Sequence, residues 1–211
     1  MFKTIAKEIV AEHEVKKSRF IAYICPVNTE EEVQKIIEQL KIKWPSARHY
    51  CYAYILREKP HIERYSDDGE PSGTAGMPIL DILKYSELEN VVAVVIRYFG
   101  GTLLGTGGLV KAYTESVKLA IEKAQIIKMS RSAKIKIVTD YSNYGVIENE
   151  CKKWGVHIKD VQFTDKVSIY LYVLIQEVDD LANLLINRTS NNIDFKIEGY
   201  EYIDIAKIKS I

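Results

Sequence analysis

The stretch Val91-Val-Ala-Val-Val-Ile-Arg-Tyr-Phe-Gly-Gly-Thr-Leu-Leu-Gly-Thr-Gly-Gly-Leu-Val110 decides the first half of the fold. Its β-branched opening, residues 91–99, is typical of a buried strand. A glycine block, residues 97–108, follows and leads directly into an apolar stripe over 109–124, which predicts a helix. Strand, glycine loop and helix in this order either bind an anion at the exposed N–H groups of the helix start or form a tight junction between the strand and the helix.

A second glycine block, Ser66-Asp-Asp-Gly-Glu-Pro-Ser-Gly-Thr-Ala-Gly76, precedes another expected helix, which Pro78 opens. The two blocks hold eight of the 11 glycines in the chain. Glycine inside an element costs about 0.5–1 kcal/mol relative to alanine, so this density needs positive φ angles or a close backbone approach. We therefore predict that both blocks lie side by side on one face and carry the activity.

The rest of the first half reads as strands and one further helix. Apolar patterning predicts strands over 4–14, 18–27 and 49–56, and a helix that Asn28 or Thr29 caps and Pro45 ends. The second strand is apolar on both faces, which predicts that it is buried on both. The segment 127–132 breaks the helical pattern, and we interpret it as a linker.

The second half has a compact order of elements. We expect strand 133–139, helix 143–154, strand 156–164, strand 167–175, helix 178–187 and strand 194–205. This β-α-β-β-α-β order is typical of the split βαβ plait. The sequence therefore predicts an α+β protein with two domains, residues 1–130 and residues 131–211.

Composition narrows the class of partner and compartment. The 211 residues contain 29 basic and 29 acidic side chains, a balance that argues against broad binding to nucleic acid or to an acidic membrane. No apolar run approaches the ~20 residues of a membrane span, and the amino terminus has no apolar core like that of a signal peptide. The three cysteines are widely spaced, which favours a reducing cytoplasm over a disulfide framework.

The glycine blocks supply the candidate binding surface, and we predict no cofactor or metal. Lys111 and Arg97 flank the second block, where a Walker loop is excluded because Thr106 stands in the lysine position. Acidic residues of the first block either hold a cation such as Mg²⁺ or cap a turn. The expected binding residues are Asp67, Asp68, Gly69, Glu70, Ser72, Gly73, Thr74, Arg97, Gly100, Gly101, Gly105, Gly107, Gly108 and Lys111.

One further pair has chemical potential. His49 and Cys51 stand two apart on an expected strand and so share a face. They are either a nucleophile with its base or a packed cysteine beside a hydrogen-bonded histidine. This pattern leaves the catalytic residues unassigned.

The same residues resemble a known family. The run Glu14-Val-Lys-Lys-Ser-Arg-Phe20, the motif Ala47-x-His49-x-Cys51-Tyr-Ala53 and both glycine blocks, with Leu104-Gly-x-Gly-Gly-Leu109 and Ala112-Tyr113, look like the Impact family. The resemblance implies a first domain of the ribosomal-protein-S5-domain-2 type, as in translation factors and in small-molecule kinases of the galactokinase group. It implies a ferredoxin-like second domain similar to the carboxy-terminal domains of elongation factor G. Eukaryotic members of the family are translational regulators that act through a protein partner.

The leading hypothesis is therefore a non-enzymatic, cytoplasmic regulator that binds RNA, the ribosome or a translation-associated protein, without a membrane. The alternative is an enzyme acting on a phosphorylated or other anionic small molecule, with Asp67, Asp68 or Glu70 as base or metal ligand. A third reading, a peptidase using Cys51, has the least support.

Overall fold

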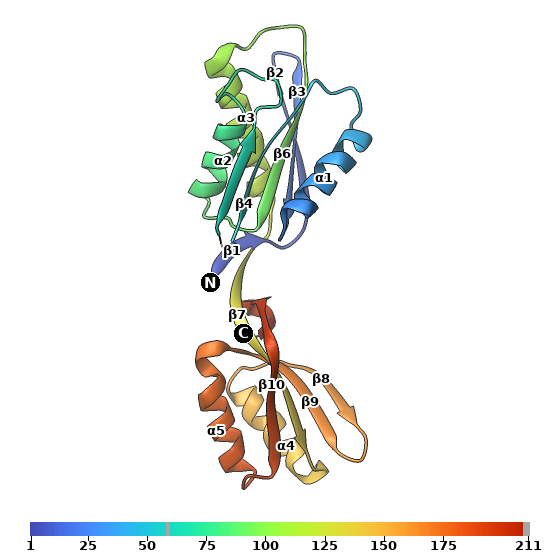
Figure 1. Ribbon diagram of the computed structural model, residues 1–211, viewed down its shortest axis with the longest axis vertical. Coiled ribbons are helices and arrows are strands. Elements are labelled where there is room, and N and C mark those ends of the chain that lie inside the picture. Colours follow the sequence, from blue (N-terminus) through green and yellow to red (C-terminus); the bar gives the residue numbers. More distant parts are fainter. Residues whose placement is uncertain (58–59, 209–211) are drawn as a thin grey trace. The chain divides into compact units, whose positions relative to one another are not determined.

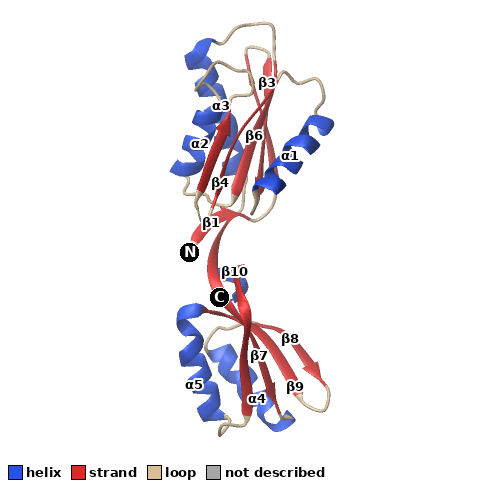
Figure 2. Cartoon of the chain, in the orientation of Figure 1, coloured by secondary structure: helices blue, strands red, loops and turns tan. Residues whose placement is uncertain are grey.

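A computed structural model describes residues 1–57 and 60–208. The chain divides into two compact units, residues 2–127 and residues 128–211 together with Met1. Both units combine a sheet with helices, as the predicted α+β class requires (Figures 1 and 2). The predicted boundary at 130/131 falls inside a single long strand, β7 (Ile126–Thr139), and stays a prediction.

The N-terminal domain is built on an antiparallel five-stranded sheet. Its strands lie in the order β2 (Ile9–Val15), β3 (Ser18–Pro26), β6 (Val91–Tyr98), β4 (His49–Leu56) and β5 (Ile62–Ser66). Helix α1 (Glu30–Lys43) packs on one face, and α2 (Gly76–Tyr85) and α3 (Gly105–Glu122) pack on the other (Figure 1). The first glycine block therefore leads into the amino end of α2, and the second lies between the carboxyl end of β6 and the amino end of α3.

Strand β3 shows why the sheet sits between helices. Phe20 and Ile24 belong to the core under α2 and α3, whereas Ile21 and Tyr23 belong to the core under α1. All four are almost fully buried, which confirms the burial on both faces that the continuous apolar pattern predicts. The predicted cap of α1 is also present, since the Glu32 N–H donates to the Thr29 hydroxyl.

The C-terminal domain is a four-stranded antiparallel arrangement with two helices on one face. The strands lie in the order β10 (Ile193–Asp204), β7, β9 (Val167–Leu174) and β8 (Ile158–Phe163). The helices are α4 (Tyr141–Lys153) and α5 (Val178–Arg188), with short turns η1 (Ile175–Glu177) and α6 (Ile205–Ile208). This order is the ferredoxin-like fold that the βαββαβ pattern predicts.

The sequence predictions omit strand β5, and three predicted elements differ in the structure. The supposed linker, 127–132, is part of β7, and the backbone of its residues 129–132 pairs with β10 even though the side chains alternate poorly. The expected strand 4–14 is two strands, β2 and β1 (Phe2–Ile5), the latter pairing with β7. Helix α3 begins at Gly105 rather than at 109, so glycines that read as a loop form its first turn.

Two glycines of the second block differ in the space around them, so alanine substitutions at the two positions can be compared. A Cβ on Gly100 would lie 2.0 Å from the backbone carbonyl carbon of Lys17, whereas a Cβ on Gly107 would meet nothing within 4 Å. We expect Gly100→Ala to lower the free energy of unfolding by about 1–3 kcal/mol or more. Gly107→Ala should raise it by up to about 1 kcal/mol, because alanine favours the helix.

Urea unfolding of both variants and the parent measures this difference. Equal stability of Gly100→Ala and the parent would contradict the close approach between the block and the turn before β3.

Candidate functional site

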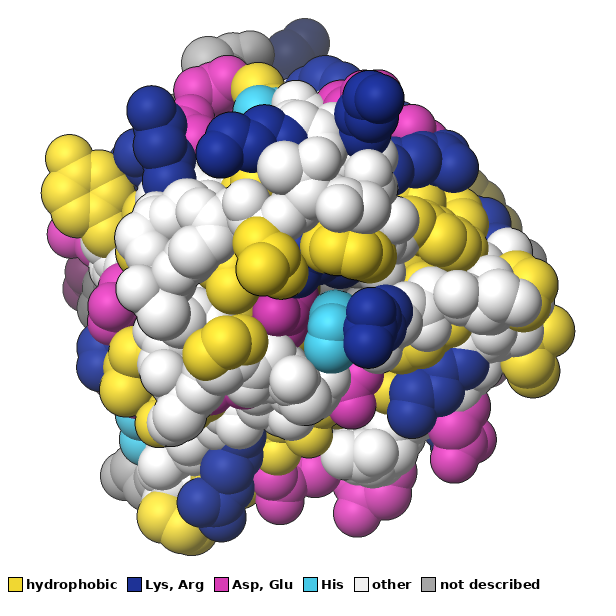
Figure 3. Space-filling view, turned by 90° about the horizontal axis from the view of Figure 1, so that it is seen from above, with side chains coloured by type: hydrophobic (Ala, Val, Ile, Leu, Met, Phe, Trp, Pro, Cys, Tyr) yellow, Lys and Arg dark blue, Asp and Glu magenta, His cyan; other side chains and the backbone are white. Residues whose placement is uncertain are grey.

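A pocket of about 420 Å³ lies where the two glycine blocks meet in the N-terminal domain. Its floor and rim come from β4, the first block, the end of β6 and the start of α3. Figure 3 looks onto this end of the domain and shows a histidine beside basic, acidic and hydrophobic side chains. The lining includes Arg48, His49, Gly69, Glu70, Arg97, Phe99, Gly105 and Thr106.

A buried ion pair forms the base of the pocket. Arg97 Nη1 lies 2.6 Å from Glu70 Oε1, and the two side chains are only 6% and 4% exposed. The Tyr113 hydroxyl donates to the same oxygen over 2.8 Å, and burial raises the pKa of this phenol far above its ordinary value, so it stays a donor. Arg97 Nε has no hydrogen-bond partner among the described residues, although Arg97 lines the pocket.

The other two acidic residues of the first block serve the backbone. The Asp67 carboxylate accepts from the N–H groups of Gly73, Ala75 and Gly76 over 2.8–3.0 Å, which caps the start of α2. The Asp68 carboxylate accepts from the Tyr50 N–H over 2.6 Å. Both carboxylates are therefore engaged in holding the loop, and Glu70 alone of the three lines the pocket.

Helix α3 opens toward the pocket with its first turn. Among the described residues no side chain caps this helix, and its first turn holds no acidic residue. Gly105 has φ of +72°, a conformation that favours glycine, and both Gly105 and Thr106 line the pocket. The N–H groups and the partial positive charge of the helix start therefore face the same space as Arg97.

The remaining predicted residues are scattered around this center. Lys111 and Gly108 line a second hollow of about 440 Å³ with His13 and Lys16, so Lys111 and Arg97 do not share one pocket. Thr74 is buried, and its hydroxyl donates to the Pro71 carbonyl. Four other predicted residues are exposed: Ser72, Gly73, Gly101 and Gly107. Gly100 lies against the turn before β3.

His49 holds a more central position than the sequence indicates. Its Nδ1 lies 2.8 Å from the Asp68 carbonyl oxygen, which only accepts, so Nδ1 carries the proton. Its Nε2 lies 3.8 Å from Glu70 Oε1 at the pocket wall. The sequence indicates His49 through its spacing from Cys51, whereas no sequence pattern indicates the neighbouring pocket residue Arg48.

Cys51 does not act as a thiolate in this setting. Burial raises the pKa of its thiol, and its Sγ–H group lies 2.9 Å from the Asp67 carbonyl oxygen. The packed alternative from the sequence therefore describes it better than the nucleophile. In residues 1–57 and 60–208 no group of three His, Cys, Asp or Glu side chains is placed to hold a metal, and no helix there is long and apolar enough to cross a membrane.

The fold and pocket define a two-domain α+β protein with a glycine-framed site, and known proteins share this architecture. The family model of the Impact N-terminal domain matches residues 16–121, and that of a domain of unknown function matches residues 137–192. IMPACT family member YvyE of Bacillus subtilis is 36% identical over 197 residues, covering 92% of this chain and 91% of that protein.

Two other similar proteins complete the comparison. IMPACT family member YigZ of Escherichia coli is 42% identical over 120 residues, 56% of this chain and 59% of that protein. A solved crystal structure of a hypothetical protein superposes with a TM-score of 0.62 at 28% identity and covers 94% of this chain and 97% of the other. The chain belongs to the IMPACT family.

The buried pair predicts a clear energetic signature. We expect Arg97→Ala and Glu70→Ala each to lower the free energy of unfolding by about 3–5 kcal/mol, because either change leaves one buried charge uncompensated. The double variant should lose less than the sum of the two. Glu63→Ala, which removes the partly exposed partner of the surface residue Lys84, should cost about 0–1 kcal/mol.

Chemical denaturation of the four variants completes a double-mutant cycle with a surface control. Strict additivity of Arg97→Ala and Glu70→Ala would show that the two side chains do not stabilise each other.

Proposed function

We propose that this protein is a translation-linked regulator that acts by binding, and that the pocket between the glycine blocks is its binding face. The carrying observation is that the uncapped start of α3 and the Arg97 side chain line the same pocket. Both supply N–H donors with positive charge, which suits an anionic group such as a phosphate or a carboxylate.

The rim of the pocket favours a macromolecule as the carrier of that anion. Leu103 is 82% exposed and Phe99 is 38% exposed, and both line the pocket. Arg48 is also exposed and lies with its guanidinium carbon 5.7 Å from the center of the Phe99 ring. Exposed apolar and arginine side chains around a polar center are typical of an interaction surface.

The class of partner follows from the family. The Impact resemblance implies regulators of translation that act through a partner, so we propose RNA, the ribosome or a translation-associated protein, in the cytoplasm. Binding is favoured over catalysis because the Asp67 and Asp68 carboxylates are engaged with backbone N–H groups and Glu70 is paired with Arg97.

A second candidate is an enzyme acting on a phosphorylated or other anionic small molecule. The observation that favours it is the fixed tautomer of His49, whose Nε2 is left to accept a proton at the pocket wall beside Glu70. A metabolite screen with His49→Gln separates the two candidates, since only an enzyme would turn over a substrate and lose that turnover in the variant.

Thr106→Asp tests the binding face with Thr106→Asn as its matched neutral control. A carboxylate in the first turn of α3 should raise the free energy of unfolding by about 0.3–1 kcal/mol relative to asparagine, because it complements the helix dipole. The same charge should repel an anion from the pocket. We expect at least about five-fold weaker binding of purified ribosomes or of their extracted RNA.

Sedimentation with ribosomes and fluorescence titration with RNA provide the two readouts. If Thr106→Asp and Thr106→Asn bind as the parent does while remaining folded, the pocket is not the binding face.

A further inference from the structure

The C-terminal sheet has one face that its helices leave uncovered. Helices α4 and α5 pack against side chains such as Ile135, Ile137 and Ile169. Because side chains alternate along a strand, Lys136 on β7 and the half-buried Tyr170 and Tyr172 on β9 point to the opposite face. This face therefore carries aromatic side chains on a central strand with a lysine on the strand beside it.

A lysine lies over each of the two tyrosines. Lys159 Nζ is 4.8 Å from the center of the Tyr172 ring and 2.9 Å from its hydroxyl oxygen. Lys136 Nζ is 5.6 Å from the center of the Tyr170 ring. The tyrosines are two residues apart on one strand, which separates them by about 7 Å. The face thus carries two neighbouring pairs of an aromatic ring and an ammonium group.

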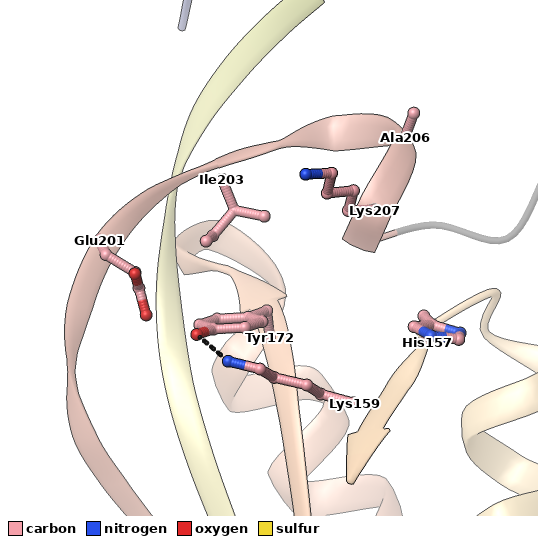
Figure 4. A pocket seen from close by; sticks show the side chains of 7 residues that line it. All are labelled: His157, Lys159, Tyr172, Glu201, Ile203, Ala206 and Lys207. Carbon is pink, nitrogen blue, oxygen red and sulfur yellow. Dashed lines mark hydrogen bonds between the residues drawn. The ribbon is translucent and has the colours of Figure 1, made fainter. Parts of the chain in front are cut away.

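A pocket of about 550 Å³ lies at one end of this face, beneath the turn α6. Figure 4 shows the Tyr172 ring at its floor, Ile203 and Lys207 above the ring and His157 on the far side. The backbone N–H of His157 donates to the Ile208 carbonyl and holds α6 in place over the sheet. The space is bounded by an aromatic ring below and by cationic side chains at its edges.

We propose that this face binds single-stranded RNA, with one base stacked on Tyr172 in the pocket and the next on Tyr170. Lys136, Lys159 and Lys207 hold the backbone phosphates. This proposed RNA-binding face belongs to the C-terminal domain alone. It gives the regulator an RNA partner at a surface other than the glycine-framed pocket. Either surface can fail its test without the other.

Stacking and charge both favour a single strand as the occupant. Unstacked bases in single strands pack on aromatic side chains, one base to each ring, and nearby lysines meet the backbone. The lysines now over the rings are held by an interaction that is weaker at exposed sites than a stacked base, so a phosphate can draw them aside. A free nucleotide would stack on one ring only, which leaves the second tyrosine and its lysine without a role.

Acidic groups on the same face offset part of the positive charge of its lysines. Glu201 lines the pocket, and Asp160 is the register partner of Tyr170 on β8. Lys134 is engaged by Glu198 at 3.1 Å. These carboxylates disfavour broad attraction to duplex phosphates, so recognition rests on ring stacking with a few placed lysines.

Fluorescence anisotropy of the full chain with labelled ten-nucleotide oligouridylate and oligoadenylate tests the proposal. We expect Tyr170→Leu and Tyr172→Leu each to weaken binding by about five-fold to 100-fold, the usual effect of losing one stacked base. Lys207→Ala should lower the slope of log affinity against log salt by about one. Tyr85→Leu is the matched control, since Tyr85 is 86% exposed on the N-terminal domain.

Several results would overturn the proposal. Unchanged affinity in Tyr170→Leu and Tyr172→Leu would remove the stacking role. Uridine monophosphate or an RNA duplex binding as tightly as the oligonucleotide would reject a single strand as the ligand. Absence of any oligonucleotide binding, as expected if the face serves a protein, would also overturn it, whereas loss of binding in Thr106→Asp alone bears only on the N-terminal pocket.

Discussion

The ion pair between Arg97 and Glu70 determines how the two glycine blocks come together. Each side chain is buried, and a buried charge without a partner is strongly destabilising, so the end of β6 and the first block must meet. Tyr113 of α3 donates to the same Glu70 oxygen, which ties the helix to that junction. These contacts bring the first glycine block, the end of β6 and helix α3 together, and the pocket lies where they meet.

This junction also explains the distribution of glycine. Gly69 and Gly105, which line the pocket, have φ angles of +81° and +72°, a backbone conformation that favours glycine. Gly100 lies against the backbone before β3, where no side chain fits. Gly107 lies in open space inside a helix, and its local cost has no packing reason in the structure.

The fold could be predicted well where periodicity is strong, and the site only in part. Buried strands such as β6 and the βαββαβ order follow from apolar patterning, but 127–132 pairs through its backbone, which side-chain patterning does not report. Asp67, Asp68 and Glu70 are chemically alike in sequence, and only tertiary placement gives two of them to backbone N–H groups. A helix that starts at 109 would put Lys111 in its first turn beside Arg97, but α3 starts at Gly105, and Lys111 lines a different hollow. The role of Tyr113 as a donor is hidden in an apolar stripe.

The balanced charge of the chain constrains how either surface works. With 29 basic and 29 acidic residues, long-range attraction to a polyanion is weak, and at physiological salt fields fade over about 8 Å. Recognition must therefore come from groups placed within contact distance. In the proposed N-terminal site these are N–H donors beside a buried ion pair, and on the proposed RNA-binding face they are rings fixed on a strand with lysines over them. Rigid placement compensates for the missing net charge, so changes that loosen either scaffold should weaken binding even without altering any charged residue.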